Sequence, residues 1–201
     1  TPAQMRTAIG LCATRASGLK SQFGTMGKPY NAGTAASNGV ECAALARLGF
    51  SSADDGLNGQ QGFVPTHCDV PQDAPGWPGE LLFADVSFKF HACCHGTHAM
   101  IEALSAARAQ HGISADHVAR IALRVNPRWL SVCDIKQPRS GLEVKFSYCR
   151  LAAMVFNDVP TAAEGSYTDE LARDPRMSAF AERVRVVGDA AVSDTQVAGE
   201  V

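Results

Sequence analysis

Apolar residues recur with helical spacing over two stretches in the first part of the chain. The spacing predicts an amphipathic helix over residues 2–15. Its apolar stripe consists of Met5, Ile9 and Cys12. A second helix is predicted over residues 34–48, where many alanines and glycines on one stripe favour close packing against other helices. The glycines and the proline of residues 17–33 predict a shaped loop between the two helices.

The later part of the chain mixes helical and strand-like patterns. Helices are predicted over residues 97–111, over 141–156 and from Thr168 onward. Strands are predicted over residues 118–125 and 183–187. Residues 190–201 show no packing pattern and are expected to fray.

The segment between these parts, residues 50–82, is rich in Gly, Pro, Asp and Gln. It predicts a short helix followed by a long connection, and so a domain boundary near Leu82. We therefore expect an α+β protein with a mainly helical portion over residues 1–82 and a smaller α+β domain over 83–201.

Composition limits the classes of function. The chain has 201 residues, of which 46% are hydrophobic and 19% charged, and its formal net charge is -2. This balance gives no general attraction to nucleic acid or anionic lipid. No apolar stretch approaches the roughly 20 residues of a membrane span, and no signal peptide opens the chain. We expect a cytoplasmic protein, and its seven irregularly spaced cysteines disfavour a disulfide scaffold.

The first segment with candidate chemistry is residues 24–33, where Lys28 stands among glycines before a predicted helix. Unpaired amides at a helix N-terminus and a lysine beside them suit a carboxylate or phosphate. A nucleotide P-loop is rejected, because Pro29 stands where that motif requires a hydroxyl residue. The simpler interpretation is a solvated loop lysine.

The second segment is residues 89–98, which place Lys89 and three histidines before another predicted helix. The histidines are His91, His95 and His98. Imidazoles exchange protons near neutral pH, so these side chains are candidate acids and bases. Each of them could instead be a buried histidine with a structural role.

Two other chemistries stay open for this segment. The three histidines would share a face of a continuous helix and could bind a metal, but Gly96 and Thr97 indicate that the helix begins only there. Cys93 or Cys94 beside a histidine could also act as a nucleophile, although no oxyanion-hole motif accompanies them.

Three ordered blocks of sequence resemble the MmgE/PrpD family, which includes 2-methylcitrate dehydratase, cis-aconitate decarboxylase and iminodisuccinate epimerase. The first block is Ser17-Gly18-Leu19 with Gln22-Phe23-Gly24-Thr25-Met26-Gly27-Lys28-Pro29, Ala32-Gly33, Ala35-Ala36 and Gly39-Val40. The second is Cys93-Cys94-His95-Gly96-Thr97-His98 preceded by Lys89, and the third is Gly141-Leu142-Glu143-Val144-Lys145-Phe146-Ser147.

The resemblance implies a cofactor-independent enzyme of small polycarboxylates, with a large helical domain, a smaller lid domain and usually a homodimeric assembly. It implies that Lys28 is the active-site lysine and that Lys89 and His98 are basic residues on the lid side. Many members of the family have histidine where this chain has Asn31, and His91 stands where proline is expected.

Members of the family are more than twice as long, so the resemblance implies a central and C-terminal portion that could require a separate N-terminal chain. The leading hypothesis is a hydro-lyase related to 2-methylcitrate dehydratase. Its candidate catalytic residues are Lys28, His91, His95 and His98, and its candidate substrate-binding residues are Lys28, Asn31, Lys89 and Thr97. The alternatives are an epimerase of a dicarboxylate such as iminodisuccinate and a non-catalytic carboxylate-binding remnant.

Overall fold

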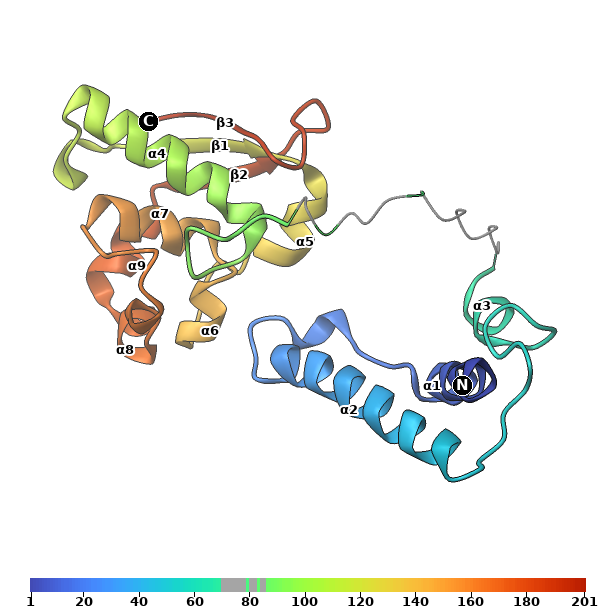
Figure 1. Ribbon diagram of the computed structural model, residues 1–201. Coiled ribbons are helices and arrows are strands. Elements are labelled where there is room, and N and C mark those ends of the chain that lie inside the picture. Colours follow the sequence, from blue (N-terminus) through green and yellow to red (C-terminus); the bar gives the residue numbers. More distant parts are fainter. Residues whose placement is uncertain (70–78, 80–82, 84–85) are drawn as a thin grey trace. The chain divides into compact units, whose positions relative to one another are not determined.

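The computed structural model describes residues 1–69, 79, 83 and 86–201, which form two compact units (Figure 1). The first unit comprises Thr1–Gln22 and Met26–Val86, and the second comprises Phe23–Thr25 and Ser87–Val201. The boundary predicted at Leu82 falls on a residue outside the described part of the chain.

The first unit is built on two helices, α1 (Pro2–Arg15) and α2 (Gly27–Arg47). Thr1 caps α1, and its hydroxyl accepts a hydrogen bond from the backbone of Gln4 at 3.3 Å. The two helices pack through small buried side chains, which allows close approach. These side chains are Ala8, Cys42 and Ala46. The short elements of this unit are η1 (Lys20–Gln22) and α3 (Phe63–His67).

Helix α2 begins seven residues earlier than predicted, at Gly27 instead of Thr34. The prediction was wrong because it interpreted Pro29 as a helix breaker. Proline is tolerated in the first turn of a helix, where its missing N–H would have no intrahelical partner. The backbone N–H of the next residue, Tyr30, already donates to the carbonyl of Met26 at 3.3 Å.

The apolar stripe predicted on α1 is only partly buried within the first unit. Met5 is 64% exposed and Ile9 45% exposed, whereas Ala8 between them is buried. The two exposed side chains line an apolar groove of about 440 Å³ together with Gly39 and Phe63. Helical spacing therefore located the stripe correctly, but not its degree of burial.

The second unit contains a three-stranded sheet with the order β2-β1-β3. Strand β1 (Ile121–Val125) pairs in parallel with β2 (Val184–Gly188), with Ile121 opposite Val184. Strand β3 (Val197–Glu200) pairs with β1 in the antiparallel direction. The strand at the end of the chain corrects the expectation that residues 190–201 fray.

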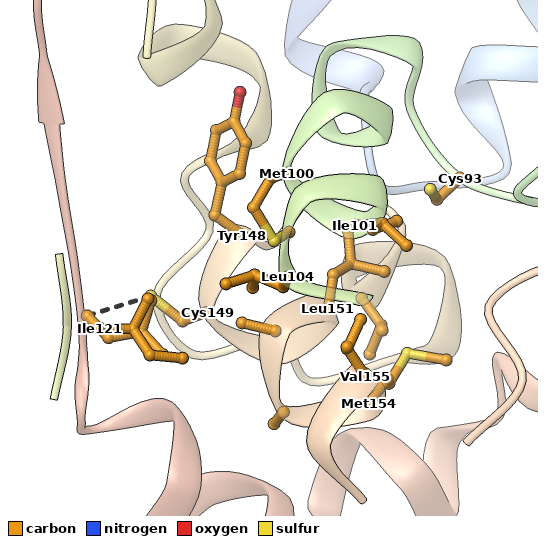
Figure 2. Close-up of a cluster of buried hydrophobic side chains, with 14 of the residues drawn as sticks. Cys93, Met100, Ile101, Leu104, Ile121, Tyr148, Cys149, Leu151, Met154 and Val155 are labelled. Carbon is orange, nitrogen blue, oxygen red and sulfur yellow. Dashed lines mark hydrogen bonds between the residues drawn. The ribbon is translucent and has the colours of Figure 1, made fainter. Parts of the chain in front are cut away.

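Helices α4 (His98–His111) and α7 (Tyr148–Phe156) form the centre of the second unit with the sheet (Figure 2). Every residue of α7 is buried, and α4 contributes Met100, Ile101 and Leu104 to the same core. Gly112 ends α4 as predicted, with the left-handed φ of 63° that glycine favours. The helical stretch predicted over 141–156 is interrupted at residues 145–147.

The remaining helices of this unit are short. They are η3 (His95–Thr97), η4 (Ala115–His117), η5 (Pro127–Trp129), α5 (Leu130–Cys133), α6 (Gly141–Val144), η6 (Glu164–Ser166), α8 (Asp169–Arg173) and α9 (Pro175–Ala181). Thr168 caps α8 as predicted, because its hydroxyl accepts from the backbone of Leu171 at 3.1 Å.

The predicted fold class is confirmed: the chain is α+β, with a mainly helical portion followed by a part that contains the small sheet. In the part of the chain that the structure describes, no helix has both the length and the apolar character needed to cross a bilayer.

Candidate functional site

The segment that carries the three predicted histidines is fixed to the second unit by backbone hydrogen bonds. The N–H of Ala92 donates to the carbonyl of Thr161, and that of Cys94 donates to the carbonyl of Lys145, both at 3.0 Å. The hydroxyl of buried Tyr148 donates to the carbonyl of Gly96 at 2.7 Å. These hydrogen bonds therefore fix the backbone of the segment from which the histidine side chains project.

The structure brings His91, His95 and His98 together. The ring of His98 lies 5.0 Å from that of His91, edge to face, and 5.8 Å from that of His95, nearly parallel. The ring of His95 also stacks on that of Trp129, at 6.4 Å. We call His91, His95 and His98 the histidine cluster. As predicted, they do not lie on one continuous helix, because α4 begins at His98.

His91 has hydrogen-bond partners at both ring nitrogens. Its Nε2 lies 2.7 Å from a carboxylate oxygen of Glu102, and its Nδ1 lies 2.8 Å from the hydroxyl of Thr161. Its side chain is only 11% exposed, whereas that of Glu102 is 69% exposed. A ring held on both sides is fixed in orientation and well suited to position its neighbour.

His98 differs from His91, because its Nε2 is buried without a hydrogen-bond partner among the described residues. Burial lowers the pKa of His98, and the charges of His91, His95 and Lys89 lower it further, against an opposing interaction with the backbone of Cys93. The neutral imidazole is therefore favoured at neutral pH. A neutral ring with a free nitrogen can accept a proton.

Lys89 precedes the histidine cluster in the sequence, two residues before His91. Its ammonium donates to the carbonyl of Cys93 at 3.1 Å, and its side chain is exposed. Lys89 therefore contacts the backbone of Cys93, the residue whose backbone also interacts with His98.

Thr97 and Cys93 are buried and make their hydrogen bonds inside the second unit. Thr97 is fully buried, and its hydroxyl donates to the carbonyl of Cys94 at 2.7 Å while contacting the sulfur of Cys93 at 3.2 Å. Burial raises the pKa of the Cys93 thiol, which reduces the fraction of reactive thiolate. This environment gives no support to the alternative of a cysteine nucleophile.

Lys28 and Asn31 belong to the first unit. Lys28 is half-buried in the first turn of α2, where the backbone amides have no intrahelical partners. The side-chain amide of Asn31 donates to the carbonyl of Leu19 at 3.3 Å and so ties the preceding loop to α2. The predicted roles of these two residues in substrate binding stay predictions.

Several residues near the histidine cluster were not found from the sequence. Glu102 follows His98 by four residues on one helix, a spacing that places both on one face and could have indicated the partner of His91. Trp129 and Thr161 lie far along the chain from the cluster, and no local pattern connects them to it. Among the described residues, no group of three or more His, Cys, Asp or Glu side chains is arranged to hold a metal ion.

The protein is thus an α+β protein of two units, and its second unit carries imidazoles suited to proton exchange and a lysine suited to anion binding. A sequence profile of the MmgE/PrpD N-terminal domain matches residues 1–74, and a profile of the MmgE/PrpD C-terminal domain matches residues 91–200. The chain therefore belongs to the MmgE/PrpD family. The family includes dehydratases and related enzymes, so membership of it supports an enzymatic role for this chain. A search of curated proteins found no match.

Proposed function

We propose that the protein is a lyase of small polycarboxylates, related to 2-methylcitrate dehydratase, which removes a proton and eliminates water. The observation that carries this proposal is the placement of His98: its Nε2 is buried without a hydrogen-bond partner among the described residues, and its ring lies 5.0 Å from that of His91 and 5.8 Å from that of His95. Membership of the MmgE/PrpD family supports the same class of chemistry.

In the proposed reaction a base takes a proton from the carbon next to a carboxylate of the substrate. The electron pair of that C–H bond forms a carbon–carbon double bond, and the hydroxyl group leaves with a proton as water. Negative charge builds on the carboxylate during proton removal, so cations that bind it more strongly at that stage lower the barrier.

We assign the role of base to His98 and that of carboxylate anchor to Lys89 and Lys28. His95 is exposed and stacks on the ring of His98, which makes it the candidate acid that protonates the leaving hydroxyl. His91 is a positioning residue, because Glu102 and Thr161 occupy both of its ring nitrogens. Asn31 is a candidate hydrogen-bond donor to the substrate. We further propose a homodimer, with a separate N-terminal chain as a second candidate partner.

The test separates lyase, epimerase and non-catalytic binding in one experiment. Citrate, 2-methylcitrate and related acids are incubated with the protein in deuterium oxide and followed by ultraviolet absorbance and proton NMR. A lyase forms an unsaturated, absorbing product. An epimerase of a dicarboxylate such as iminodisuccinate instead incorporates deuterium without unsaturation. Binding without either signal would leave a carboxylate-binding remnant and refute the proposed reaction.

Matched variants connect the activity with the cluster. His98→Asn is expected to lower turnover by about 100-fold to 10,000-fold, the usual contribution of a general base. His111→Asn changes an exposed histidine at the other end of the same helix and should leave turnover unchanged. Lys28→Ala is expected to abolish turnover while preserving the melting temperature. Equal loss of activity and melting temperature would indicate a structural lysine.

A further inference from the structure

The second unit contains a cavity of about 870 Å³ that shares no residue with the histidine cluster. Its walls come from residues 136–139, the start of α7, helices α8 and α9, and strand β2. Ligand sites in proteins commonly enclose about 300–1,000 Å³. The cavity is therefore large enough for a small metabolite.

Basic side chains dominate the charged lining of this cavity. They are Lys136, Arg139, Arg150, Arg173 and Arg185. Glu182 is the one acidic residue among the lining residues that the structure describes. Lys136, Arg139 and Arg173 each pair with a carboxylate whose residue does not line the cavity. Within the described ranges, the side chain of Arg185 makes no ion pair or side-chain hydrogen bond.

Arg150 is the buried member of this group, with 4% of its surface exposed. Its terminal nitrogens donate to the hydroxyl of Ser178 at 3.1 Å and to the carbonyl of Asp174 at 3.4 Å, both uncharged acceptors. Its Nε has no hydrogen-bond partner among the described residues. The carboxylate of Asp174 is instead engaged by Arg176, at 3.0 Å.

A buried guanidinium without a carboxylate partner is costly, because an arginine side chain keeps its charge at every physiological pH. Burial lowers the pKa of Arg150, against the opposing effect of the nearby Asp174 carboxylate and the Cys149 thiol. The carboxylate of Asp174 is near enough to offset part of this cost, but it makes no direct hydrogen bond to the guanidinium. An anion in the cavity would add a countercharge in direct contact. A guanidinium can bind two oxygens of one carboxylate or phosphate at once, which favours these anions over halides.

We propose that this cavity is a second binding site, for a small polyanion that carries carboxylate or phosphate groups, with Arg150 and Arg185 as its central contacts. Cations from several separate elements line the cavity, so a ligand with two or more anionic groups fits it better than a single anion. The site is independent of the proposed lyase reaction and of the residues assigned to it.

The experiment titrates the full chain with pyrophosphate and, separately, with citrate by isothermal calorimetry at constant ionic strength. Citrate can also bind at the proposed lyase site, so only binding that Arg185→Gln weakens is assigned to the cavity. Saturable binding of this kind is expected for at least one anion, and the tighter of the two identifies phosphate or carboxylate as the preferred group. Arg185→Gln is expected to weaken that binding about tenfold, as the loss of one charge-assisted pair would. This variant changes an exposed side chain, so it avoids the risk that Arg150→Gln fails to fold.

Two further variants locate the bound anion. Arg6→Gln removes the same charge from an exposed position on α1 and should leave the affinity unchanged. His98→Asn should also leave it unchanged, even when it stops turnover. The proposal is overturned if neither anion binds saturably, if Arg6→Gln weakens binding as much as Arg185→Gln, or if His98→Asn abolishes binding. Failure of the lyase reaction alone would not affect it.

Discussion

Replacing Gly96 by alanine is expected to disturb the histidine cluster through Trp129. A Cβ at this position would lie 2.9 Å from Cε2 of the Trp129 ring and closer still to Cδ2 and Cε3. Carbon atoms in contact normally stay about 3.5–4.0 Å apart, so the ring must withdraw by about 1 Å. The ring cannot withdraw freely, because its Nε1 donates to the carbonyl of Asp194 at 2.7 Å.

Overpacking of this kind costs about 1–3 kcal/mol in free energy of unfolding. Because the ring of His95 stacks on Trp129, displacement of the indole should also lower turnover. The free energy of unfolding is measured by urea denaturation, followed by far-ultraviolet circular dichroism. Gly165→Ala is the control, because a Cβ there meets no atom within 4 Å and the backbone φ lies outside the left-handed region. If both variants unfold within about 0.5 kcal/mol of each other, which is the usual range for a neutral surface change, the packing argument is wrong.

Three further predictions concern the second unit, the last of them in comparison with a cysteine of the first unit. Tyr148→Phe removes the donor to the carbonyl of Gly96, and we expect urea denaturation to show a loss of about 1–2 kcal/mol. Because the pKa of His98 is lowered in the folded state, the unfolded state takes up the proton first as pH falls. Stability should therefore decline as the pH falls below about 6.5, and melting curves of His98→Asn should show a smaller decline. Alkylation mapped by mass spectrometry should modify exposed Cys68 long before Cys93, because the Cys93 thiol is buried and has a raised pKa. Equal rates of modification would contradict the burial of Cys93.

The helices that the sequence predicted well are those whose ends carry local signals. Thr1 caps α1, and Thr168 caps α8. Gly112 ends α4 in the left-handed conformation. Capping depends on residues within one turn of the helix end, so a single sequence is sufficient to locate it.

The elements that were misjudged depend on information that is not local. Strand β3 has only four residues, one of them glycine, and is held by hydrogen bonds to β1, more than 70 residues earlier in the chain. Such pairing leaves no periodic pattern in the strand itself. The start of α2 was misjudged for a different reason, because Pro29 is compatible both with a loop and with the first turn of a helix.

The candidate site shows the same division between local and distant information. The motif of residues 89–98 was visible because its lysine and histidines are close in sequence. The division of roles among the histidines was not visible, since the partner of His91 at Nδ1, Thr161, lies 70 residues away. The sequence therefore supplied the candidate groups, whereas the fold shows that both ring nitrogens of His91 have partners and that Nε2 of His98 has none among the described residues.

His98 and Arg150 show how one physical constraint leads to the two different kinds of site proposed in this unit. Both side chains lie in environments where burial lowers their pKa and disfavours the charged form. Histidine can respond by releasing its proton, which leaves a neutral group ready to accept one during a reaction. Arginine has no such response, because its pKa stays far above neutral pH, and so its charge must be stabilised by hydrogen-bond acceptors or by an anion. The cluster around His98 is therefore suited to proton transfer, and the cavity around Arg150 to holding an anion without chemical change.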